Sequence, residues 1–565
     1  MGMSMVTKAA ERETRGPRMD AGIYQSPLRG FMDDLTITTT SHIQARWVLS
    51  ALEENVSWAR MKFKPRKSRS LVLKKGRICQ VKLKVQDEEI PTLVNNPIKC
   101  LGKWFDQSLS DNASVKNTLS QAKSWMKKVD GSGLPGKYKA WIYQQGVLPR
   151  LMWLLLIYEV PVTSVEGLER SVSSYLRRWI GVPSGFTSAG LYGRSSKLQL
   201  QISSVVEEFK VAKCRLVMTL RDSSDSRVSG AGIQKRTGRK WSASTSVDQA
   251  ESMLQLRDVV GNICIGRQGL GMVHFQQWKN ATATERRGMV QTEVRRVEED
   301  QRRAKAVELG KQGKWLKWEL PERRLSWSEL WRKDQYRIAF LLRSVYDTLP
   351  SPSNLHQWRM TEDPSCQLCG KRGPMSHILS GCQVALTQGS YRWRHDKVLR
   401  ELAGVVEEER RKKRPRATTG KGKVFVKQGE TVEGRKAART SLLDRGQDWE
   451  LQVDLDGKLV FPCIVDTTLR LDMFLKSTTS KTLIVVELTV PWEENCEEAN
   501  ERKSLKYADL MADCRDKGWS VWLFPVEVGC RGFPSRSVTT DQALTTSRNV
   551  GEWQSQHPCE NWVKQ

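Results

Sequence analysis

Four potential metal ligands stand close together in the segment CQLCGKRGPMSHILSGC. They are Cys366, Cys369, His377 and Cys382, with the spacing Cys-x2-Cys-x7-His-x4-Cys. Two thiolates separated by two residues can face one metal ion from a tight turn, and the later imidazole and thiolate can complete a tetrahedron. Because four protein ligands leave no open position, the pattern predicts a structural Zn²⁺ site. The alternative is a chance arrangement of reduced cysteines.

A second constellation lies near the C-terminus, in RLDMFLKSTTSKTLIVVELTV (470–490), which predicts two strands joined by a turn. Asp472 and Glu487 fall on different strands with 14 residues between them, so a hairpin can bring their carboxylates side by side. Lys503 and Lys506 follow on a predicted helix and share a face. Two carboxylates that hold Mg²⁺, with a lysine beside the phosphate, suit metal-dependent phosphodiester cleavage. The alternative is a set of exposed structural residues.

A third acidic motif is FMDD at residues 31–34, followed by the β-branched run LTITTT. The adjacent residues Asp33 and Asp34 could hold Mg²⁺ ions at a hairpin tip, as nucleotidyl transfer requires. A solvated turn explains the same residues without any chemistry. The pair alone therefore decides little.

The composition bounds what these motifs can serve. The chain has 565 residues, a length that corresponds to roughly three to five domains. Of its residues, 39% are hydrophobic and 27% are charged. A net charge of +29 favours a polyanionic partner, above all DNA or RNA, although a generically basic protein is the alternative. The 12 Cys residues, without a secretory signal, favour reduced thiols. Pro149 and Arg150 interrupt the most apolar stretch (147–160), so no membrane span is expected.

The elements that must position these residues alternate in type along the chain. Residues 41–61 have apolar side chains at helical spacing, namely Ile43, Trp47, Leu52, Val56 and Trp58. SLVLKKGRI and VKLKV read as strands around a turn, 112–220 and 284–310 as helical, and 220–250 as a flexible connection. Residues 447–533 alternate between strand and helix signals.

The order of these parts resembles that of non-LTR (LINE-like) retrotransposon polyproteins whose endonuclease is restriction-like. FMDD resembles the aromatic-x-Asp-Asp box of reverse transcriptases, and LPGKYKAWIYQQGVLPRLMW resembles the start of their thumb. YRIAFLLRSVYDTLPSPSNLHQW (336–358) resembles the linker motif, and the zinc knuckle, RHD (394–396) and RLD…VVELTV…KSLKY follow. The resemblance covers about residues 21–535 and is most specific at the knuckle and at the Asp-x14-Glu spacing.

The resemblance implies a multidomain α+β and α/β chain. Its parts would be a disordered N-terminus (1–20), a partial reverse-transcriptase palm (21–110), a helical thumb (111–220), a mostly helical linker (221–360), a CCHC zinc knuckle (361–400), a basic flexible linker (401–446), a PD-(D/E)xK-like αβ endonuclease domain (447–535) and an unstructured tail (536–565). Asp33 and Asp34 would match the polymerase pair, Asp472 and Glu487 the endonuclease carboxylates, and Lys503 or Lys506 the endonuclease lysine. In such families the endonuclease nicks DNA and the polymerase copies element RNA.

Two departures from the family shape the functional hypotheses. The family's polymerase needs a further Asp upstream of FMDD, and only 30 residues precede Phe31, so we expect a truncated protein that cannot reverse-transcribe alone unless a full-length element protein acts in trans. Leu471 stands where the family usually has Pro. Three hypotheses remain: a Mg²⁺-dependent nicking protein, a catalytically dead nucleic-acid-binding relic, and a host-adopted scaffold. RRKKRPR (410–416) predicts nuclear localisation, or is a solvated charge run.

Overall fold

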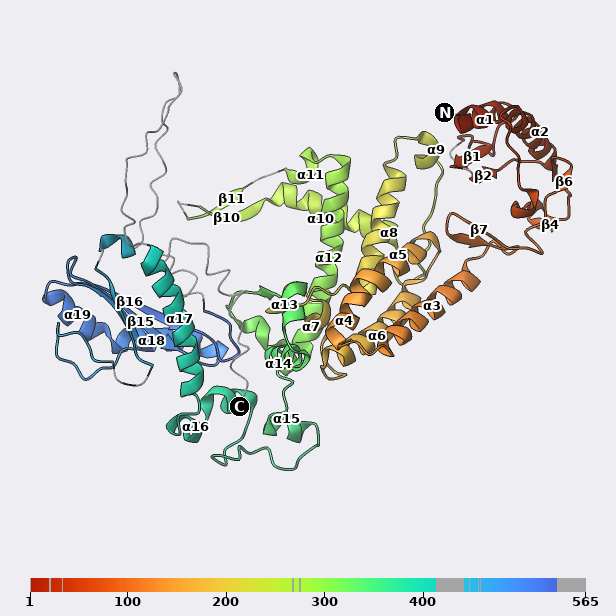
Figure 1. Cartoon of the computed structure of the whole chain (residues 1–565). Helices are drawn as coiled ribbons and strands as arrows, with labels where there is room; N and C mark the ends of the chain where they lie inside the picture. Colours follow the sequence, from red (N-terminus) through yellow and green to blue (C-terminus); the bar gives the residue numbers. More distant parts are fainter. Residues whose placement is uncertain are drawn as a thin grey trace, which may run out of the picture. The chain divides into compact units, whose positions relative to one another are not determined.

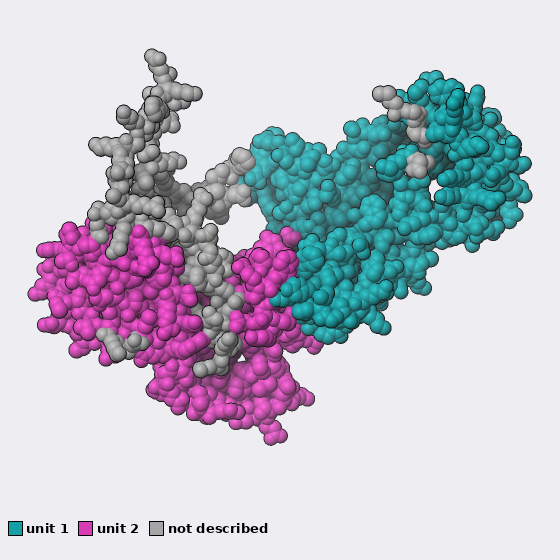
Figure 2. Space-filling model, in the orientation of Figure 1, with its two compact units in different colours: residues 1–179, 202–302 teal, residues 180–201, 303–565 magenta. Residues whose placement is uncertain are grey.

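The computed structural model describes residues 2–19, 22–32, 34–266, 269–273, 276–412, 442–446, 448–455, 457 and 459–535. It is a mixed helix and sheet protein that divides into two compact units. Unit 1 comprises residues 1–179 and 202–302, and unit 2 comprises residues 180–201 and 303–565 (Figures 1 and 2). None of the described helices combines the length and apolar character that crossing a bilayer requires.

Unit 1 consists of helices and small two-stranded hairpins. Its helices are α1 (Gly2–Glu11), α2 (His42–Trp58), α3 (Asn112–Asp130), α4 (Gly136–Ile142), α5 (Leu148–Ile157), α6 (Val162–Ile180), α8 (Val205–Arg221), α9 (Ser226–Ser229), α10 (Ala243–Val260), α11 (Gln277–Asn280) and α12 (Ala283–Glu308), of which α12 ends in unit 2. Its strands pair as β1–β2 (Leu28–Phe31, Asp34–Ile37), β3–β4 (Val72–Lys74, Arg77–Cys79), β5–β6 (Lys84–Val85, Glu88–Glu89), β7–β8 (Ile98–Cys100, Lys103–Phe105) and β10–β11 (Asn262–Gly266, Gly269–Val273).

Four expectations for unit 1 are corrected. The segment expected to be disordered, 1–20, contains α1, because Val6 and Ala10 are buried against the α2 core. Helix α2 has the expected extent and buries Leu52 and Val56, but Ile43, Trp47 and Trp58 are exposed. The turn of the first predicted strand pair lies inside LVLKKGRIC, so β3 and β4 both come from the stretch read as one strand. The expected flexible connection at 220–250 contains α9 and the start of α10. The helical predictions for 112–220 and 284–310 are confirmed.

Unit 2 has a helical part followed by a four-stranded sheet. The helical part contains α7 (Ser188–Tyr192), α13 (Trp327–Arg332), α14 (Gln335–Val345), α15 (Pro352–Gln357), α16 (Gln383–Thr387) and the short parallel pair β9 (Leu198–Gln199) and β12 (Arg323–Arg324). The sheet part contains α17 (Arg392–Lys412), β13 (Glu450–Val453), β14 (Met473–Ser477), β15 (Thr482–Thr489), α18 (Cys496–Lys506), α19 (Ala508–Asp516) and β16 (Ser520–Glu527). Because α17 runs to Lys412, the predicted flexible linker is helical at its start, and 413–441 and the tail 536–565 lie outside the described residues.

The sheet has the strand order β13-β14-β15-β16, antiparallel except for the last pair. Strand β15 is buried along nearly its whole length, as expected of a strand covered on both faces. One face packs under α17, with Val398 and Leu399 in the same core as Met473 and Val486. The other face packs under α18 and α19, with Tyr507 and Leu510 beside Phe474 and Val485 (Figure 1). The predicted strand–turn–strand over 470–490 and the alternation of strand and helix over 447–533 are thereby confirmed for the described residues.

An arginine ties the helical part of unit 2 to the sheet. The Arg531 guanidinium lies between the rings of Trp318, at 4.0 Å, and Trp492, at 3.6 Å. Its Nε donates to Glu493 Oε2 (2.6 Å) and its Nη1 to the Ser344 carbonyl (3.2 Å). These contacts join the segment before the Cys/His cluster to the C-terminal sheet.

Candidate functional site

The four predicted zinc ligands converge in the structure. The ligand atoms of Cys366, Cys369, His377 and Cys382 all lie within 4.8 Å of one another, and the described residues contain no other group of three or more such ligands. Cys369 Sγ lies 3.2 Å from His377 Nε2, and Cys366 Sγ lies 4.0 Å from Cys382 Sγ. Such spacings fit one tetrahedral ion with metal–sulfur bonds of about 2.3 Å. The group can therefore bind a metal and is compatible with structural zinc.

Local backbone geometry explains why these ligands converge. The Gly370 N–H donates to the Cys366 carbonyl (2.8 Å), closing the knuckle, and Gly370 has φ 69°, a conformation that glycine adopts without strain. The Tyr391 hydroxyl contacts the His377 carbonyl (3.2 Å) and accepts from the Cys382 N–H (3.3 Å), which fixes the second half of the cluster. Burial opposes ionisation of the Cys366 thiol, but the backbone N–H groups of Leu368 and Cys369 lower its pKa to about 7. A low pKa favours the thiolate form that a metal requires.

The second site lies where β14 and β15 pair. The Asp472 N–H donates to Glu487 Oε1 (3.1 Å), and the Leu488 N–H donates to Asp472 Oδ2 (2.8 Å). These two bonds continue the antiparallel register of Met473 with Val486, so each carboxylate is held by the backbone of the opposite strand. The Glu487 side chain is fully buried, whereas the Asp472 side chain is 21% exposed. The hairpin therefore brings the two predicted carboxylates together.

The two candidate lysines behave differently. Lys503 Nζ donates to Glu487 Oε2 (2.7 Å) and lies 3.7 Å from Asp472 Oδ2. Lys506 Nζ instead donates to the Tyr507 hydroxyl (3.1 Å), which itself donates to the Arg470 carbonyl (2.7 Å). Of the two lysines, Lys503 is therefore the one in contact with the carboxylate pair.

A histidine that sequence reasoning did not select completes the surroundings of Asp472. His395, on α17, places Nε2 at 3.6 Å from Asp472 Oδ2 and Nδ1 at 3.2 Å from Asp396 Oδ1. It lies 77 residues before Asp472, so only the packing of α17 on the sheet brings the two together. No local pattern marks it, apart from the RHD triplet to which it belongs.

The ionisable groups of this site perturb one another. Burial raises the pKa of Glu487, the negative charge of Asp472 adds to the effect, and Lys503 offsets it only partly. Burial also opposes ionisation of Asp472, but His395, Lys503 and the Leu488 N–H lower its pKa below the usual range. Burial disfavours protonated His395, yet the carboxylates of Asp472 and Asp396 raise its pKa. Such perturbed pKa values are common at functional sites, and they also occur in structural ion pairs.

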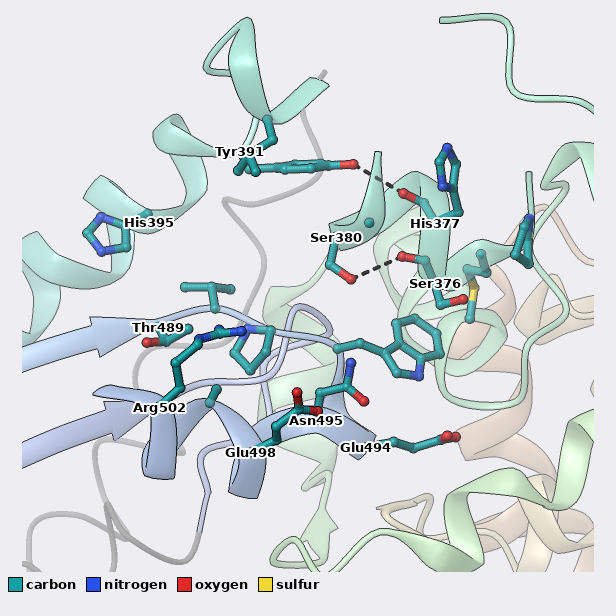
Figure 3. A pocket seen from close by; sticks show the side chains of 18 of the residues that line it. Ser376, His377, Ser380, Tyr391, His395, Thr489, Glu494, Asn495, Glu498 and Arg502 are labelled. Carbon is teal, nitrogen blue, oxygen red and sulfur yellow. Dashed lines mark hydrogen bonds between the residues drawn. The ribbon is translucent and has the colours of Figure 1, made fainter. Parts of the chain in front are cut away.

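A pocket of about 1140 Å³ opens between the two sites within unit 2. Figure 3 shows His377, Tyr391 and His395 on one side, and Thr489, Arg502 and Glu498 on the other. Its charged lining includes five basic side chains and three acidic ones, namely Lys311, Lys314, Arg392, Arg502, Lys503, Asp347, Glu494 and Glu498. The excess of cations suits an anionic ligand.

The N-terminal acidic motif has a different setting. Strands β1 and β2 form a hairpin in which Phe31 pairs with Asp34, and the turn includes Met32 with φ 56°. Asp34 is exposed, and Asp33 lies outside the described residues. Phe31 and Met32 are 58% and 81% exposed. The described part of this hairpin therefore offers one solvated carboxylate.

Comparison with known proteins does not assign the chain. No protein-family model matches it, and no curated protein matches it.

Proposed function

We propose that the chain binds nucleic acid and nicks DNA at the Asp472–Glu487 site in a Mg²⁺-dependent reaction, with structural zinc at the Cys/His cluster. The observation that carries the proposal is the convergence of Asp472, Glu487 and Lys503 at one end of a rigid hairpin. Mg²⁺ is commonly held by one or two protein carboxylates, with water and substrate phosphate as its other ligands. Asp472 Oδ1 accepts no hydrogen bond from any described residue and so is the oxygen available to an ion.

The residues of the site have distinct roles in this reaction. In hydrolysis, a water oxygen attacks phosphorus and releases one proton to solvent, the bond from phosphorus to the sugar oxygen breaks, and that oxygen leaves with a proton taken from solvent. When bound, Mg²⁺ would activate the water and offset phosphate charge. Asp472 and Glu487 would supply the ion's protein ligands, and Lys503 would stabilise the charge on the phosphate. The cationic lining of the adjacent pocket would attract the backbone of the substrate.

A strongly basic stretch of unit 1 supports the nucleic-acid part of the proposal. Between Glu54 and Asp87 the sequence has eleven lysines and arginines and no acidic residue. Most of these side chains are exposed, including Lys74, Lys75 and Arg77 around the β3–β4 turn. A single-sign surface of this kind favours phosphate backbones in a salt-dependent manner.

The family resemblance extends the proposal to element RNA as a second partner and to the nucleus as the location. Of the stretch RRKKRPR, Arg410 and Arg411 lie on α17, and residues 413–416 lie outside the described residues. A full-length element protein acting in trans would be a further partner of the same proposal.

A second candidate function is nucleic-acid binding without catalysis. The observation that favours it is the closed network around Glu487, both of whose oxygens already accept hydrogen bonds, from the Asp472 N–H and from Lys503. A buried carboxylate that is fully satisfied in this way can be purely structural.

Nicking of supercoiled plasmid by the purified chain with Mg²⁺ separates the two functions. We expect nicking by the wild-type chain, its loss in Asp472→Ala and Glu487→Ala, and its retention in Glu501→Ala, an exposed carboxylate on the same helix as Lys503. Retarded migration of DNA in a low-salt gel without nicking would instead support the binding function.

A further inference from the structure

The structure assigns His395 as a positioning residue for Asp472, through which it would act on the metal-dependent reaction. This inference rests on the proposed function, because it concerns the same carboxylate site. It adds a residue from a separate helix, α17, that neither the acidic motif nor the lysine motif contains.

The two oxygens of Asp472 have different surroundings. Oδ2 accepts the Leu488 N–H at 2.8 Å and also faces His395 Nε2 at 3.6 Å and Lys503 Nζ at 3.7 Å. Among the described residues, no hydrogen bond reaches Oδ1. A carboxylate fixed through one oxygen presents the other in a defined direction, as a metal ligand requires.

His395 is itself fixed from behind. Its Nδ1 lies 3.2 Å from Asp396 Oδ1, and Asp396 lies 3.7 Å from the Arg392 guanidinium one turn earlier on α17. The imidazole therefore stands between two carboxylates, with one nitrogen directed at each. This arrangement sets the ring orientation in the way that outer carboxylates orient metal-site histidines.

The packing of α17 makes this contact rigid. Val398 and Leu399 follow His395 on the helix and are buried in the same core as Met473, the residue after Asp472. A movement of His395 away from Asp472 would require the helix to shift on the sheet, and close-packed cores resist such shifts. At 3.6 Å the imidazole and the Asp472 carboxylate are in ion-pair contact rather than hydrogen-bonded.

Loss of His395 should lower the metal affinity of the Asp472 site more than it lowers the stability of the fold. Without His395, Asp472 would keep only the Leu488 N–H and the distant Lys503 as constraints, and its carboxylate could rotate. Loss of an outer partner of this kind commonly lowers metal affinity or activity about 10–100-fold. A residue that only filled space would leave metal affinity unchanged once the fold was intact.

The test is a Mn²⁺ titration of the zinc-loaded full chain, monitored by the EPR signal of free Mn²⁺. The titration of Asp472→Ala is subtracted, which isolates the Mn²⁺ binding that depends on Asp472. We expect His395→Ala to weaken that binding about 10-fold. His395→Gln, which retains a donor of similar reach, should stay within about 3-fold of wild type. His356→Ala, at an exposed histidine on α15, should match wild type.

Three results would overturn the inference. Wild-type Mn²⁺ affinity in His395→Ala would do so, as would equal loss in His395→Ala and His395→Gln, which would indicate packing alone. If His395→Ala fails to fold, Asp396→Asn provides the second test, because it leaves the imidazole in place but frees its orientation; unchanged Mn²⁺ affinity there would contradict the proposal.

Plasmid nicking by the same preparations separates this inference from the proposed function. A wild-type chain that nicks DNA, with a His395→Ala variant that binds Mn²⁺ normally, overturns the inference alone. A wild-type chain with no Asp472-dependent Mn²⁺ binding overturns both.

Discussion

Two hairpins of the chain carry acidic residues, and they differ in what surrounds the carboxylates. The β1–β2 hairpin is an isolated two-stranded sheet whose Asp34 is exposed. The β14–β15 hairpin forms the centre of a four-stranded sheet with helices on both faces, and its Glu487 is fully buried beside Lys503. An acidic pair on a hairpin therefore indicates little until burial and neighbouring cations are known, because these decide how strongly the carboxylates interact with an ion.

The largest expected effect is on the C-terminal hairpin. Asp472→Ala and Glu487→Ala should each lower Mg²⁺-dependent plasmid nicking by about 1000-fold, because each removes a protein ligand of the proposed ion. The rate of conversion of supercoiled to open-circular DNA measures this. Nicking that persists in both variants would remove the distinction between the two hairpins.

The next largest effect is expected from the two candidate lysines, whose substitutions should lower nicking by different amounts. Lys503→Ala should lower nicking about 100-fold, because Lys503 contacts the carboxylate pair, whereas Lys506→Ala should change it by less than about 3-fold, because Lys506 contacts Tyr507. The same plasmid assay compares them at matched protein folding, judged by thermal unfolding. Equal losses would show that the helix face, rather than the individual contact, matters.

Removal of zinc should destabilise only the unit that holds the cluster. Cys382→Ser should abolish zinc binding, measured by elemental analysis, and lower the unfolding midpoint of unit 2 by about 5 °C or more, because a structural site links metal binding to folding. Proteolysis with mass spectrometry can assign the affected segment. Unchanged thermal unfolding in a zinc-free variant would contradict a structural role.

The turn of the C-terminal hairpin should make its stability pH-dependent. Asp448 accepts the Thr478 and Thr479 N–H groups, each at 2.9 Å, and a bond from the Ser477 hydroxyl. These bonds, the Ser477 hydroxyl first, hold the pKa of Asp448 well below its usual value of 3.8. Because the folded-state pKa is the lower one, the stabilisation is present above about pH 3.8 and is lost as the pH falls further.

Urea unfolding at pH 5 and pH 3 checks this prediction. Wild-type stability should fall more steeply between these values than that of Asp448→Asn, which cannot lose a charge there. Parallel pH dependence in the two proteins would show that the turn does not rely on the carboxylate.

The smallest effect is expected at the N-terminal hairpin. Asp34→Ala should change nicking by less than about 2-fold and stability by less than about 0.5 kcal/mol, because an exposed side chain outside a network contributes little. The plasmid and urea assays used for the other variants suffice. A large loss of nicking would mean that the two hairpins act together.

Local patterns allowed much of the candidate site to be predicted. The four ligands of the Cys/His cluster lie within a 17-residue segment, and the Asp472–Glu487 pair needs only one hairpin, so both depend on short-range geometry. His395 could not be predicted, because its place depends on how α17 packs on a sheet that begins far downstream. Lys503 and Lys506 are three residues apart on one helix, and only the rotation of α18 against the sheet separates their roles.

The expectations about the fold that proved wrong have related causes. The N-terminal segment GMSMVTKAAE was expected to be disordered, yet it is helical because Val6 and Ala10 are buried against α2. Trp47 and Trp58 fit a helical apolar pattern but are exposed, since burial depends on which face of α2 meets α1 and the β1–β2 hairpin. Periodicity therefore predicted the extent of these elements better than their buried faces.

Locating the bound metal tests most directly whether the Asp472 site holds an ion. Anomalous scattering from crystals of the zinc-loaded chain soaked in Mn²⁺ would show each ion independently of activity. We expect a Mn²⁺ peak within coordination distance of Asp472 Oδ1, about 2.2 Å, and none beside Asp34. A peak at the β1–β2 hairpin, or no peak at Asp472, would contradict it.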